Sequence, residues 1–160
     1  MDPSELERLR EQSGLSLDRD GRFLHEGLPV EHPRVLAMLH KGLGRSPDGR
    51  PIVRFGETWA YLAVEDTLYR VVQLTLSESS DGRLVRLVAH LDDDSAETVP
   101  FESTRFALSP DEVLCLRVKG GAEWARCAPG IHARLGAYLD QSSGALTLRT
   151  RDGDLTIGRR

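Results

Sequence analysis

Alternating apolar and polar positions predict a chain built mainly from short strands, which are separated by turns rich in glycine and aspartate. Turn-forming sequences include Ser46-Pro47-Asp48-Gly49 and Ser79-Ser80-Asp81-Gly82. The runs between the turns that favour strands are residues 51–55, 58–64, 69–76, 84–91 and 98–106. We therefore expect an antiparallel meander in the middle of the chain.

Helical patterns occur in three places. Asp2 and Pro3 are typical of a helix N-cap and a first helical residue, and they predict a polar helix over residues 3–12. A second helix is expected from Pro33 to Gly42 or Gly44, where apolar positions follow helical spacing from a proline to a glycine. A third is expected over residues 131–139. Together with the strands, these helices indicate an α+β protein.

Hairpins are predicted near both ends of the chain. Asp18-Arg19-Asp20-Gly21 lies between two apolar segments and favours a tight turn. Residues 113–127 predict a second hairpin through a pair of glycines, and residues 146–157 predict a third. The apolar strand positions that we expect to be mostly buried are Trp59, Leu62, Val64, Val72, Leu87, Leu114, Leu116 and Trp124.

One segment occurs twice in related form. His32-Pro33-Arg34-Val35-Leu36-Ala37-Met38-Leu39 matches His132-Ala133-Arg134-Leu135-Gly136-Ala137-Tyr138-Leu139 in histidine, arginine, alanine and leucine, one hundred positions later. Unless the match arises by chance, it predicts two related lobes of antiparallel sheet plus helix, a duplicated unit. We place an N-terminal arm at residues 1–13, an N-terminal lobe at 14–92 and a C-terminal lobe at 93–160.

Charge and length narrow the class of protein. The chain has 160 residues with 21 basic and 25 acidic side chains, for a net charge of −4. These charges are interspersed and form no basic stripe, so polymeric nucleic acid is not an expected partner. No apolar run approaches the roughly 20 residues that span a bilayer, and the N-terminus is acidic where a secretory signal would be basic. We expect a cytoplasmic protein without a membrane partner.

The two cysteines lie in the second predicted hairpin. Cys115 and Cys127 are placed symmetrically about Gly121, so a three-residue loop would set them opposite each other on adjacent strands. They are either a cross-strand disulfide or two small, half-buried thiols. The expected reducing compartment favours the thiols.

A motif near the N-terminus resembles a known family. Asp20-Gly21-Arg22-Phe23-Leu24-His25-Glu26-Gly27-Leu28-Pro29-Val30 is similar to the opening motif of the bacterial domain-of-unknown-function family number 1285. The resemblance continues through Val64-Glu65-Asp66 and through Ala133-Arg134-Leu135, and it covers roughly Asp20 to Ile157. Phe23 stands where an indole is usual in that family.

The resemblance implies a fold and a type of function. Members of that family are duplicated α+β proteins whose C-terminal lobe is superficially similar to pleckstrin-homology folds. A nucleotide-type ligand site between the lobes and a role in signal transduction have been inferred for them, and no activity is established. Applied to this chain, the resemblance implies binding of a small anionic ligand at the lobe interface.

Five side chains are candidates for that ligand. Arg34 and Arg134 lie in the first turns of the repeated helices, where the helix dipole already favours anions. His25 could donate to a phosphate, and Glu65 and Asp66 could bind a ribose hydroxyl or a cation. The structural alternatives are a surface arginine, a half-buried imidazole bonded to a carbonyl, and a solvated or ion-paired carboxylate.

Aromatic side chains offer a further alternative. Trp59, Tyr61 and Trp124 could stack on a nucleotide base, although aromatic residues that alternate along strands are typical of a core. We expect the core role for all three.

Several chemistries lack their sequence signals. The chain has no phosphate-binding loop, no dinucleotide fingerprint, no nucleophile elbow and no common zinc spacing, so no cofactor and no metal are expected. A hydrolase that uses His25 as base and Asp66 as its orienting partner lacks a marked nucleophile. We interpret the chain as a binding or regulatory module. The rival interpretation is an adaptor that binds another protein through an exposed sheet edge or hairpin.

Overall fold

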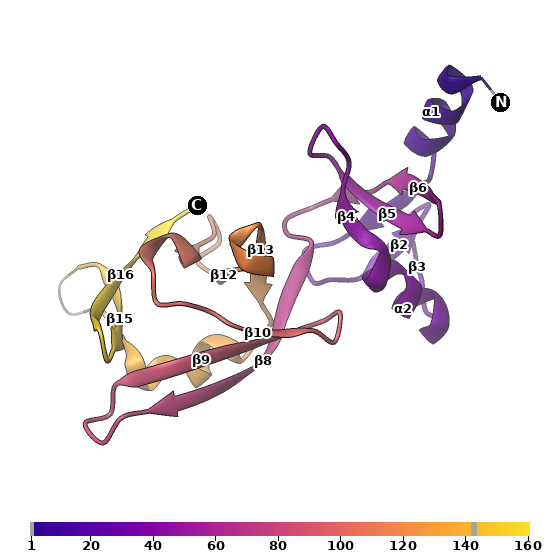
Figure 1. Cartoon of the computed structure of the whole chain (residues 1–160). Coiled ribbons are helices and arrows are strands. Elements are labelled where there is room, and N and C mark those ends of the chain that lie inside the picture. The colour runs from indigo at the N-terminus through magenta and orange to yellow at the C-terminus, as the bar shows by residue number, and fades with distance from the viewer. Residues whose placement is uncertain (1, 142–143) are drawn as a thin grey trace. The chain divides into compact units, whose positions relative to one another are not determined.

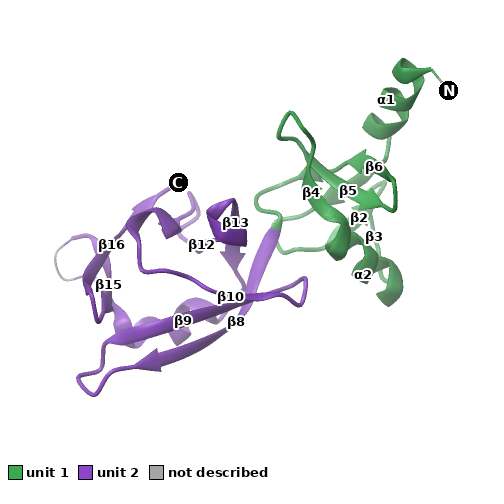
Figure 2. Cartoon of the chain, in the orientation of Figure 1, with its two compact units in different colours: residues 1–68 green, residues 69–160 purple. Residues whose placement is uncertain are grey.

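A computed structural model describes residues 2–141 and 144–160 of the chain, which divides into two compact units (Figure 2). Unit 1 ends at Leu68, and unit 2 runs from Tyr69 to Arg160. This division comes earlier in the chain than the boundary that we expected after residue 92. Its physical reason is the strand that begins at Tyr69, because that strand pairs only with later strands.

Unit 1 contains two helices and two small sheets (Figure 1). The helices are α1 (Pro3–Glu11) and α2 (Pro33–Gly42). The four-stranded sheet has the order β3-β2-β1-β7, with β1 (Leu15–Leu17), β2 (Phe23–His25), β3 (Leu28–Pro29) and β7 (Ala63–Val64). The three-stranded sheet has the order β4-β5-β6, with β4 (Leu43–Arg45), β5 (Pro51–Phe55) and β6 (Thr58–Tyr61).

The core of unit 1 lies between these elements. Phe23 of β2, Leu39 of α2 and Val53 of β5 are almost fully buried. The helix α2 ends close against β5, where a Cβ atom on Gly42 would lie 2.3 Å from the carbonyl oxygen of Arg54. Glycine is therefore required there by close packing, and any larger residue would push the helix off the sheet.

Unit 2 is a closed barrel of seven strands (Figure 1). Around the barrel the order is β8, β13, β12, β11, β16, β15 and β9, and the pair Thr150 and Leu84 joins β15 to β9. Two short strands extend the sheet, β10 on β9 and β14 on β15. The strands are β8 (Tyr69–Glu78), β9 (Leu84–Leu91), β10 (Ala96–Thr98), β11 (Phe106–Leu108), β12 (Leu114–Val118), β13 (Glu123–Cys127), β14 (Leu139–Asp140), β15 (Leu146–Thr150) and β16 (Gly153–Arg159).

Branched side chains fill the barrel. Leu114, Leu116 and Val118 of β12 are fully buried, as are Ala125 of β13 and Leu148 of β15. Short helices complete the unit: α3 (Ile131–Arg134) and the 3-10 helices η1 (Ser103–Arg105), η2 (Lys119–Gly121) and η3 (Gly136–Tyr138). Ile131 and Leu135 are buried, so the segment between β13 and β14 packs its apolar residues into the unit.

Most local predictions are confirmed. The helices at α1 and α2, the strands β5 and β9, and the three hairpins have nearly the expected bounds. The expected strand over residues 98–106 is wrong, because β10 ends before Pro100 and η1 precedes β11. The expected helix over residues 131–139 is shorter, because α3 ends at Arg134 and is followed by a 3-10 turn.

Three further expectations, on strand pairing and on burial, fail. The middle of the chain is not one meander, since β5 and β6 belong to unit 1 whereas β8 pairs in parallel with β13 in the barrel. Val72 is 47% exposed, because a register shift between Val71 and Gln73 turns it outward. Trp59, Val64 and Trp124 are only half-buried, so their expected core role is not met in full.

The cysteines are both buried and free. The observed register pairs Cys115 with Arg126, which differs by one residue from the register that would set the cysteines opposite each other. Because neighbouring strand positions point to opposite faces, Cys115 and Cys127 lie on opposite faces of the β12–β13 pair. Burial raises the pKa of the Cys127 thiol far above its usual range.

A helix followed by a hairpin occurs in each unit. In unit 1, α2 precedes the antiparallel pair β4–β5, and in unit 2, α3 and η3 precede the antiparallel pair β14–β15. The two hairpins belong to different kinds of sheet. One sheet has three strands, and the other forms the barrel. The coarse prediction of an α+β protein with largely antiparallel sheets is confirmed.

In the described part of the chain, five hairpin turns share one pattern of backbone hydrogen bonds. In each turn the N–H of the first residue donates to the carbonyl oxygen of the fifth, and the N–H of the fourth donates to the carbonyl oxygen of the first. The turns are residues 18–22, 46–50, 79–83, 91–95 and 109–113. The fourth residue of each turn has a positive φ. It is glycine in three turns, but Asp94 and Glu112 hold the same position at φ of 66°.

Candidate ligand-binding sites

Unit 1 has a pocket of about 330 Å³ between the end of α1, the start of β1 and the β5–β6 hairpin. This volume is at the lower end of the range of small-molecule sites. Its lining residues are Glu11, Ser13, Gly14, Leu15, Ser16, Arg50, Tyr61, Leu62 and Ala63. We call this site the α1 pocket.

Arg50 is the basic side chain that lines the α1 pocket. Its guanidinium lies 3.5 Å from the centre of the Tyr61 ring. Its Nη1 and Nη2 atoms donate to the two carboxylate oxygens of Glu11 at 2.5 and 3.0 Å. The Arg50 hydrogen bond lowers the pKa of Glu11, and Glu11 in turn raises the pKa of Arg50. The pocket therefore already contains a planar guanidinium in a bidentate contact with a carboxylate.

Two aromatic rings continue this surface. The rings of Trp59 and Tyr61 meet edge to face at 5.1 Å, and the Arg10 guanidinium lies 3.8 Å over the Trp59 ring. The Tyr61 hydroxyl donates to Glu7 at 2.7 Å, and this hydrogen bond raises the pKa of Tyr61. An arginine can stack on an aromatic ring while its planar donors match a carboxylate or a phosphate.

The helix α1 forms one wall of this pocket through polar contacts. Although described over its whole length, α1 has no buried residue, and Leu9 is 51% exposed. It packs against β6 through Glu7 and Arg10, and Glu11 joins it to Arg50, just before β5. Because little apolar area is buried beneath it, α1 is held mainly by charge, hydrogen bonds and ring stacking.

Ser13 fixes the floor of the α1 pocket. Its hydroxyl donates to the carbonyl oxygen of Tyr61 at 2.7 Å and accepts from the N–H of Leu15. The next residue, Gly14, has a φ of 69°. A Cβ atom there would lie 2.9 Å from the Glu26 side chain, so only glycine fits this corner without a shift.

The candidates at the four-stranded sheet lie apart from one another. His25 is exposed at the end of β2, opposite Leu15 at the start of β1. Glu65 and Asp66 follow β7, which pairs with the other side and the other end of β1. Two strand spacings, about 10 Å, therefore separate their backbones. The strand order does not support the predicted pairing of His25 with Asp66.

The remaining candidates have local partners. Glu65 accepts from the backbone N–H of Arg19 at 2.8 Å, with the Arg19 Nε atom 3.7 Å away. The N–H of Arg34, in the first turn of α2, donates to the His32 ring, so this helix start is capped by its own chain. Arg134 is in unit 2 and donates to the carbonyl oxygen of Leu74 at 3.5 Å. Its helix α3 has only four residues.

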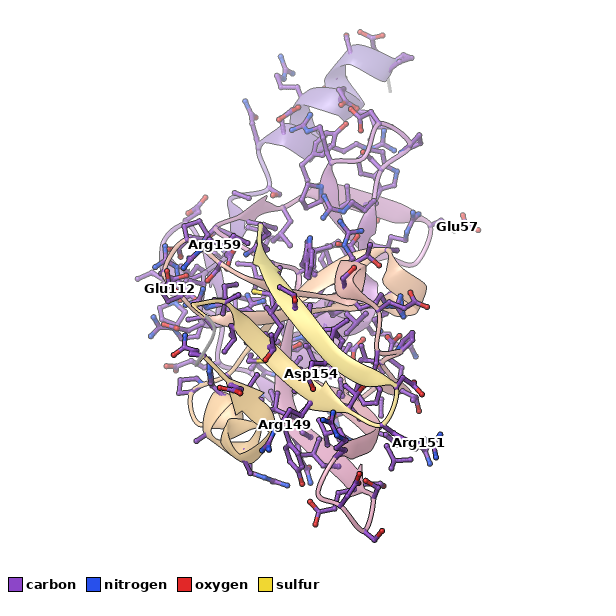
Figure 3. All side chains as sticks on the ribbon, turned by 90° about the vertical axis from the view of Figure 1, so that its left-hand side faces the viewer. Glu57, Glu112, Arg149, Arg151, Asp154 and Arg159 are labelled. Carbon is purple, nitrogen blue, oxygen red and sulfur yellow. The ribbon has the colours of Figure 1, made fainter. Side chains whose placement is uncertain are left out.

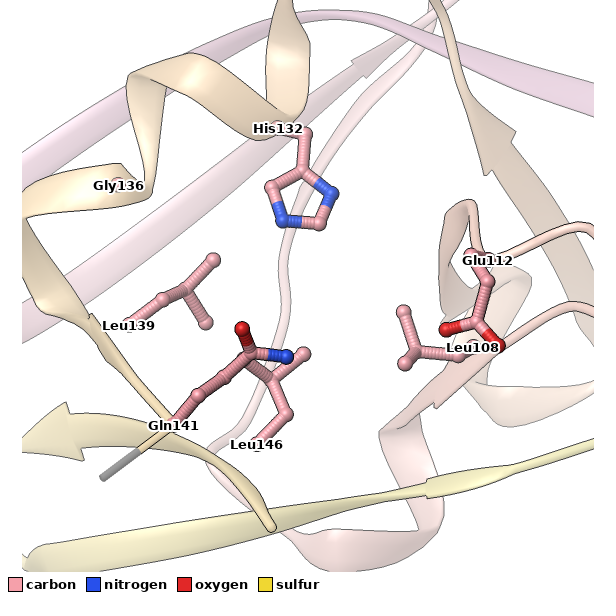
Figure 4. A pocket seen from close by; sticks show the side chains of 7 residues that line it. All are labelled: Leu108, Glu112, His132, Gly136, Leu139, Gln141 and Leu146. Atoms are coloured by element: carbon pink, nitrogen blue, oxygen red, sulfur yellow. The ribbon is translucent and has the colours of Figure 1, made fainter. Parts of the chain in front are cut away.

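Unit 2 has a pocket of about 350 Å³, which we call the barrel pocket (Figure 4). Its apolar residues are Leu108, Leu139 and Leu146, and its polar side chains are Glu112, His132 and Gln141. The Glu112 carboxylate stands on one side of the cavity, and His132 and Gln141 stand on the other (Figure 4). The carboxylate accepts from both terminal nitrogens of Arg159, labelled beside it in Figure 3.

The sequence did not single out Arg50 and Glu112 as candidate site residues, and it favoured a core role for Tyr61 over a ligand contact. Arg50 closes an Asp-Gly turn, which we interpreted only as a turn, and Tyr61 was assigned to the core. The signal for Glu112 was present: the sequence Ser109-Pro110-Asp111-Glu112 has the form of the turn at Ser46-Pro47-Asp48-Gly49 with glutamate in place of glycine.

The described residues contain neither a cluster of metal-ligating side chains nor a helix that fits a membrane span. Across residues 2–141 and 144–160, no three histidine, cysteine, aspartate or glutamate side chains gather as a metal site. Over the same residues, none of the helices has the length and apolar character that crossing a bilayer requires.

Two solved structures have a similar fold. A DUF1285 family protein from Silicibacter pomeroyi DSS-3 has a TM-score of 0.71 and 14% sequence identity, and the match covers 92% of this chain and 80% of that chain. A DUF1285 family protein from Shewanella baltica OS155 has a TM-score of 0.55 and 14% identity, covering 76% of this chain and 89% of that chain. No family model and no curated protein matches the sequence. The chain therefore has the fold of these DUF1285 family proteins, in agreement with the resemblance of the motif around His25.

Proposed function

We propose that the protein is a non-catalytic binding module that takes a small anionic, nucleotide-like ligand in the α1 pocket. The observation that carries this proposal is the Arg50 guanidinium, which stacks on Tyr61 and makes a bidentate contact with the Glu11 carboxylate. In this role Arg50 binds the anionic group of the ligand in place of Glu11. A planar ring of the ligand packs beside Tyr61.

The charge and the shape of the pocket support this choice. Glu11 shows the geometry that a ligand carboxylate or phosphate oxygen pair would adopt on Arg50. The Ser13 hydroxyl is engaged by Tyr61 and Leu15, which suits a fixed wall better than a nucleophile. Binding without reaction is therefore the simpler use of these groups.

The candidates from the sequence remain proposals of their own, because none of them lines the α1 pocket. They are His25, Arg34, Glu65 and Asp66 in unit 1 and Arg134 in unit 2, each a proposed contact for an anion, in a bacterial, cytoplasmic protein that acts in signal transduction. We also propose that the helix and hairpin segments of the two units have a common origin. The barrel with its short helices supports a relation to pleckstrin-homology folds.

Calorimetry with adenosine monophosphate tests the proposed ligand class, with inorganic phosphate and citrate as simpler anions. We expect Arg50→Ala to weaken binding by roughly ten- to a hundredfold, because a bidentate charged contact is lost. Arg50→Lys should recover only part of the affinity. Glu11→Gln should tighten binding, because the internal competitor loses its charge.

Two matched variants locate the effect. Arg86→Ala removes the same charge from an exposed strand position of unit 2 and should leave affinity unchanged. Arg34→Ala tests the start of α2. If wild type binds none of the three anions, or if Arg50→Ala binds as wild type does, the α1 pocket is not an anion site.

The alternative function is an adaptor that binds another protein. The observation in its favour is a group of exposed apolar side chains in unit 1, with Leu28 72%, Val35 40% and Met38 54% exposed. Val35 and Met38 are three residues apart and share one face of α2. Cross-linking in lysate with and without Met38→Glu tests this alternative: a partner that is lost in the variant would favour it.

A further inference from the structure

The barrel pocket differs from the α1 pocket in its chemistry, and the two pockets share no lining residue. Its lining includes one carboxylate, that of Glu112, together with the Gln141 amide, the His132 ring and three leucines. Carboxylate, amide and unprotonated imidazole all offer acceptors. A wall of leucines beside a group of acceptors suits a ligand with a positive end and a short apolar stem.

Glu112 occupies a backbone position that disfavours it. In the hairpin turns of the same type, the equivalent residues Gly21, Gly49 and Gly82 have φ of 87°, 86° and 77°. Asp94 holds this position in a fourth turn, and short polar residues tolerate it better than glutamate does. Strained positions of this kind concentrate at functional sites. The strain at Glu112 is explained if its carboxylate is needed where it stands.

The present partner of Glu112 shows which cation it accepts. The Nη1 and Nη2 atoms of Arg159 donate to the two carboxylate oxygens. Both side chains are about three-fifths exposed, at 63% and 61%, so this ion pair is open to competition from a ligand in solution. Arg159 thus shows that a guanidinium fits Glu112 in two-fold contact.

From these observations we propose that the barrel pocket binds a small organic cation, with a guanidinium or primary ammonium on Glu112 and an alkyl stem along Leu108, Leu139 and Leu146. Gln141 and His132 accept further hydrogen bonds from the ligand. The ligand replaces Arg159 on Glu112. This site is separate from the anion site of the proposed function and requires none of its residues.

Calorimetry on the full chain with agmatine, which carries a guanidinium, four methylenes and an ammonium, tests the proposal. We expect wild type to bind agmatine and Arg159→Ala to bind it more tightly, because the internal guanidinium no longer competes. Glu112→Gln should weaken binding by roughly tenfold or more, since the charge-assisted contact is lost. Absence of binding to both wild type and Arg159→Ala would overturn the site.

Thermal unfolding separates the role of Glu112 in binding from its role in the turn. Glu112→Gln and Glu112→Gly both lose the carboxylate, but only glycine relieves the positive φ. We expect Glu112→Gly to melt about 2–4 °C above Glu112→Gln, and neither to bind agmatine with wild-type affinity. Asp94→Gly relieves the same backbone position outside the pocket and should keep wild-type affinity. If Asp94→Gly loses affinity as Glu112→Gly does, the effect belongs to turn geometry, and the assignment to Glu112 is wrong.

Discussion

The α1 pocket and the barrel pocket use the same chemical pair in opposite ways. In each, the two terminal nitrogens of an arginine donate to the two carboxylate oxygens of a glutamate. The pairs are Arg50 with Glu11 and Arg159 with Glu112. In the α1 pocket the arginine stacks on an aromatic wall, and the glutamate comes from a helix. In the barrel pocket the glutamate lines the cavity, and the arginine comes from the last strand.

The walls of the two pockets also differ in how firmly they are held. The barrel pocket rests on β11, β15 and the segment that buries Ile131 and Leu135. The α1 pocket has one wall without a buried residue. A ligand for the barrel pocket therefore meets a preformed shape, whereas a ligand for the α1 pocket can bind by displacing a helix, and its affinity includes that cost.

The largest expected effect comes from making the same substitution in the core of the barrel and in α1. Leu116→Ala in the barrel should destabilise the protein by about 2–5 kcal/mol, because it leaves a cavity at a fully buried site. Leu9→Ala in α1 should change stability by no more than about 0.5 kcal/mol, since that side chain is 51% exposed. Urea unfolding measures both. Similar losses for the two variants would show that α1 is packed as firmly as the barrel.

A smaller effect calibrates the strain at Glu112. Gly82→Ala and Gly49→Ala introduce a Cβ atom where φ is 77° and 86° and where no atom lies within 4 Å of it. Each should cost about 1–2 kcal/mol, from backbone strain alone. Thermal unfolding gives the value for each unit. A cost near zero would mean that these turns tolerate side chains, and the argument from the φ of Glu112 would lose its force.

A weaker effect concerns the attachment of α1. Tyr61→Phe removes the hydroxyl that donates to Glu7, so amide hydrogens of α1 should exchange several-fold faster, by roughly two- to tenfold. Tyr138→Phe is the matched control, because its hydroxyl donates to Glu78 in unit 2. Exchange mass spectrometry should find α1 unchanged in that control. Equal exchange in wild type and Tyr61→Phe would assign the attachment to the other contacts.

The smallest expected effect is the response of α1 to pH. Because Arg50 lowers the pKa of Glu11 below its usual 4.5, the contribution of Glu11 is present above that value and is lost as pH falls through the lower pKa of the folded state. The raised pKa of Tyr61 adds an alkaline limit, where its contribution is lost as pH rises through the pKa of the folded state. Trp59 fluorescence in a Trp124→Phe background should report both changes. A signal that stays flat through the acid limb would contradict the role of Glu11.

Local signals predicted the elements well. Proline at the start and glycine at the end located α2, and the Asp-Gly pairs located the turns at Gly21, Gly49 and Gly82, because these residues act within a few positions of themselves. Closure of the barrel depends on the pairs β8–β13 and β11–β16, whose strands are far apart in the chain. Apolar alternation is satisfied by many such pairings, so it could not select among them.

The candidate sites were predicted less well than the fold. The register of β5 and β6 sets Ile52 beside Tyr61, and this brings the neighbouring Arg50 over the Tyr61 ring. That contact depends on a pairing between strands and on the docking of α1, neither of which a residue motif reveals. The family motif drew attention to His25, Glu65 and Asp66, which the structure distributes around β1.

The seam of the barrel has a consequence for folding kinetics. A single ladder pair, Thr150 with Leu84, joins β15 to β9, while Arg151 donates to Leu84 and Arg83 donates to Thr150. Since these residues are distant in sequence, joining them costs loop-closure entropy before many stabilising contacts have formed. We expect the seam to form after the transition state, so that substitutions there accelerate unfolding and leave the refolding rate almost unchanged.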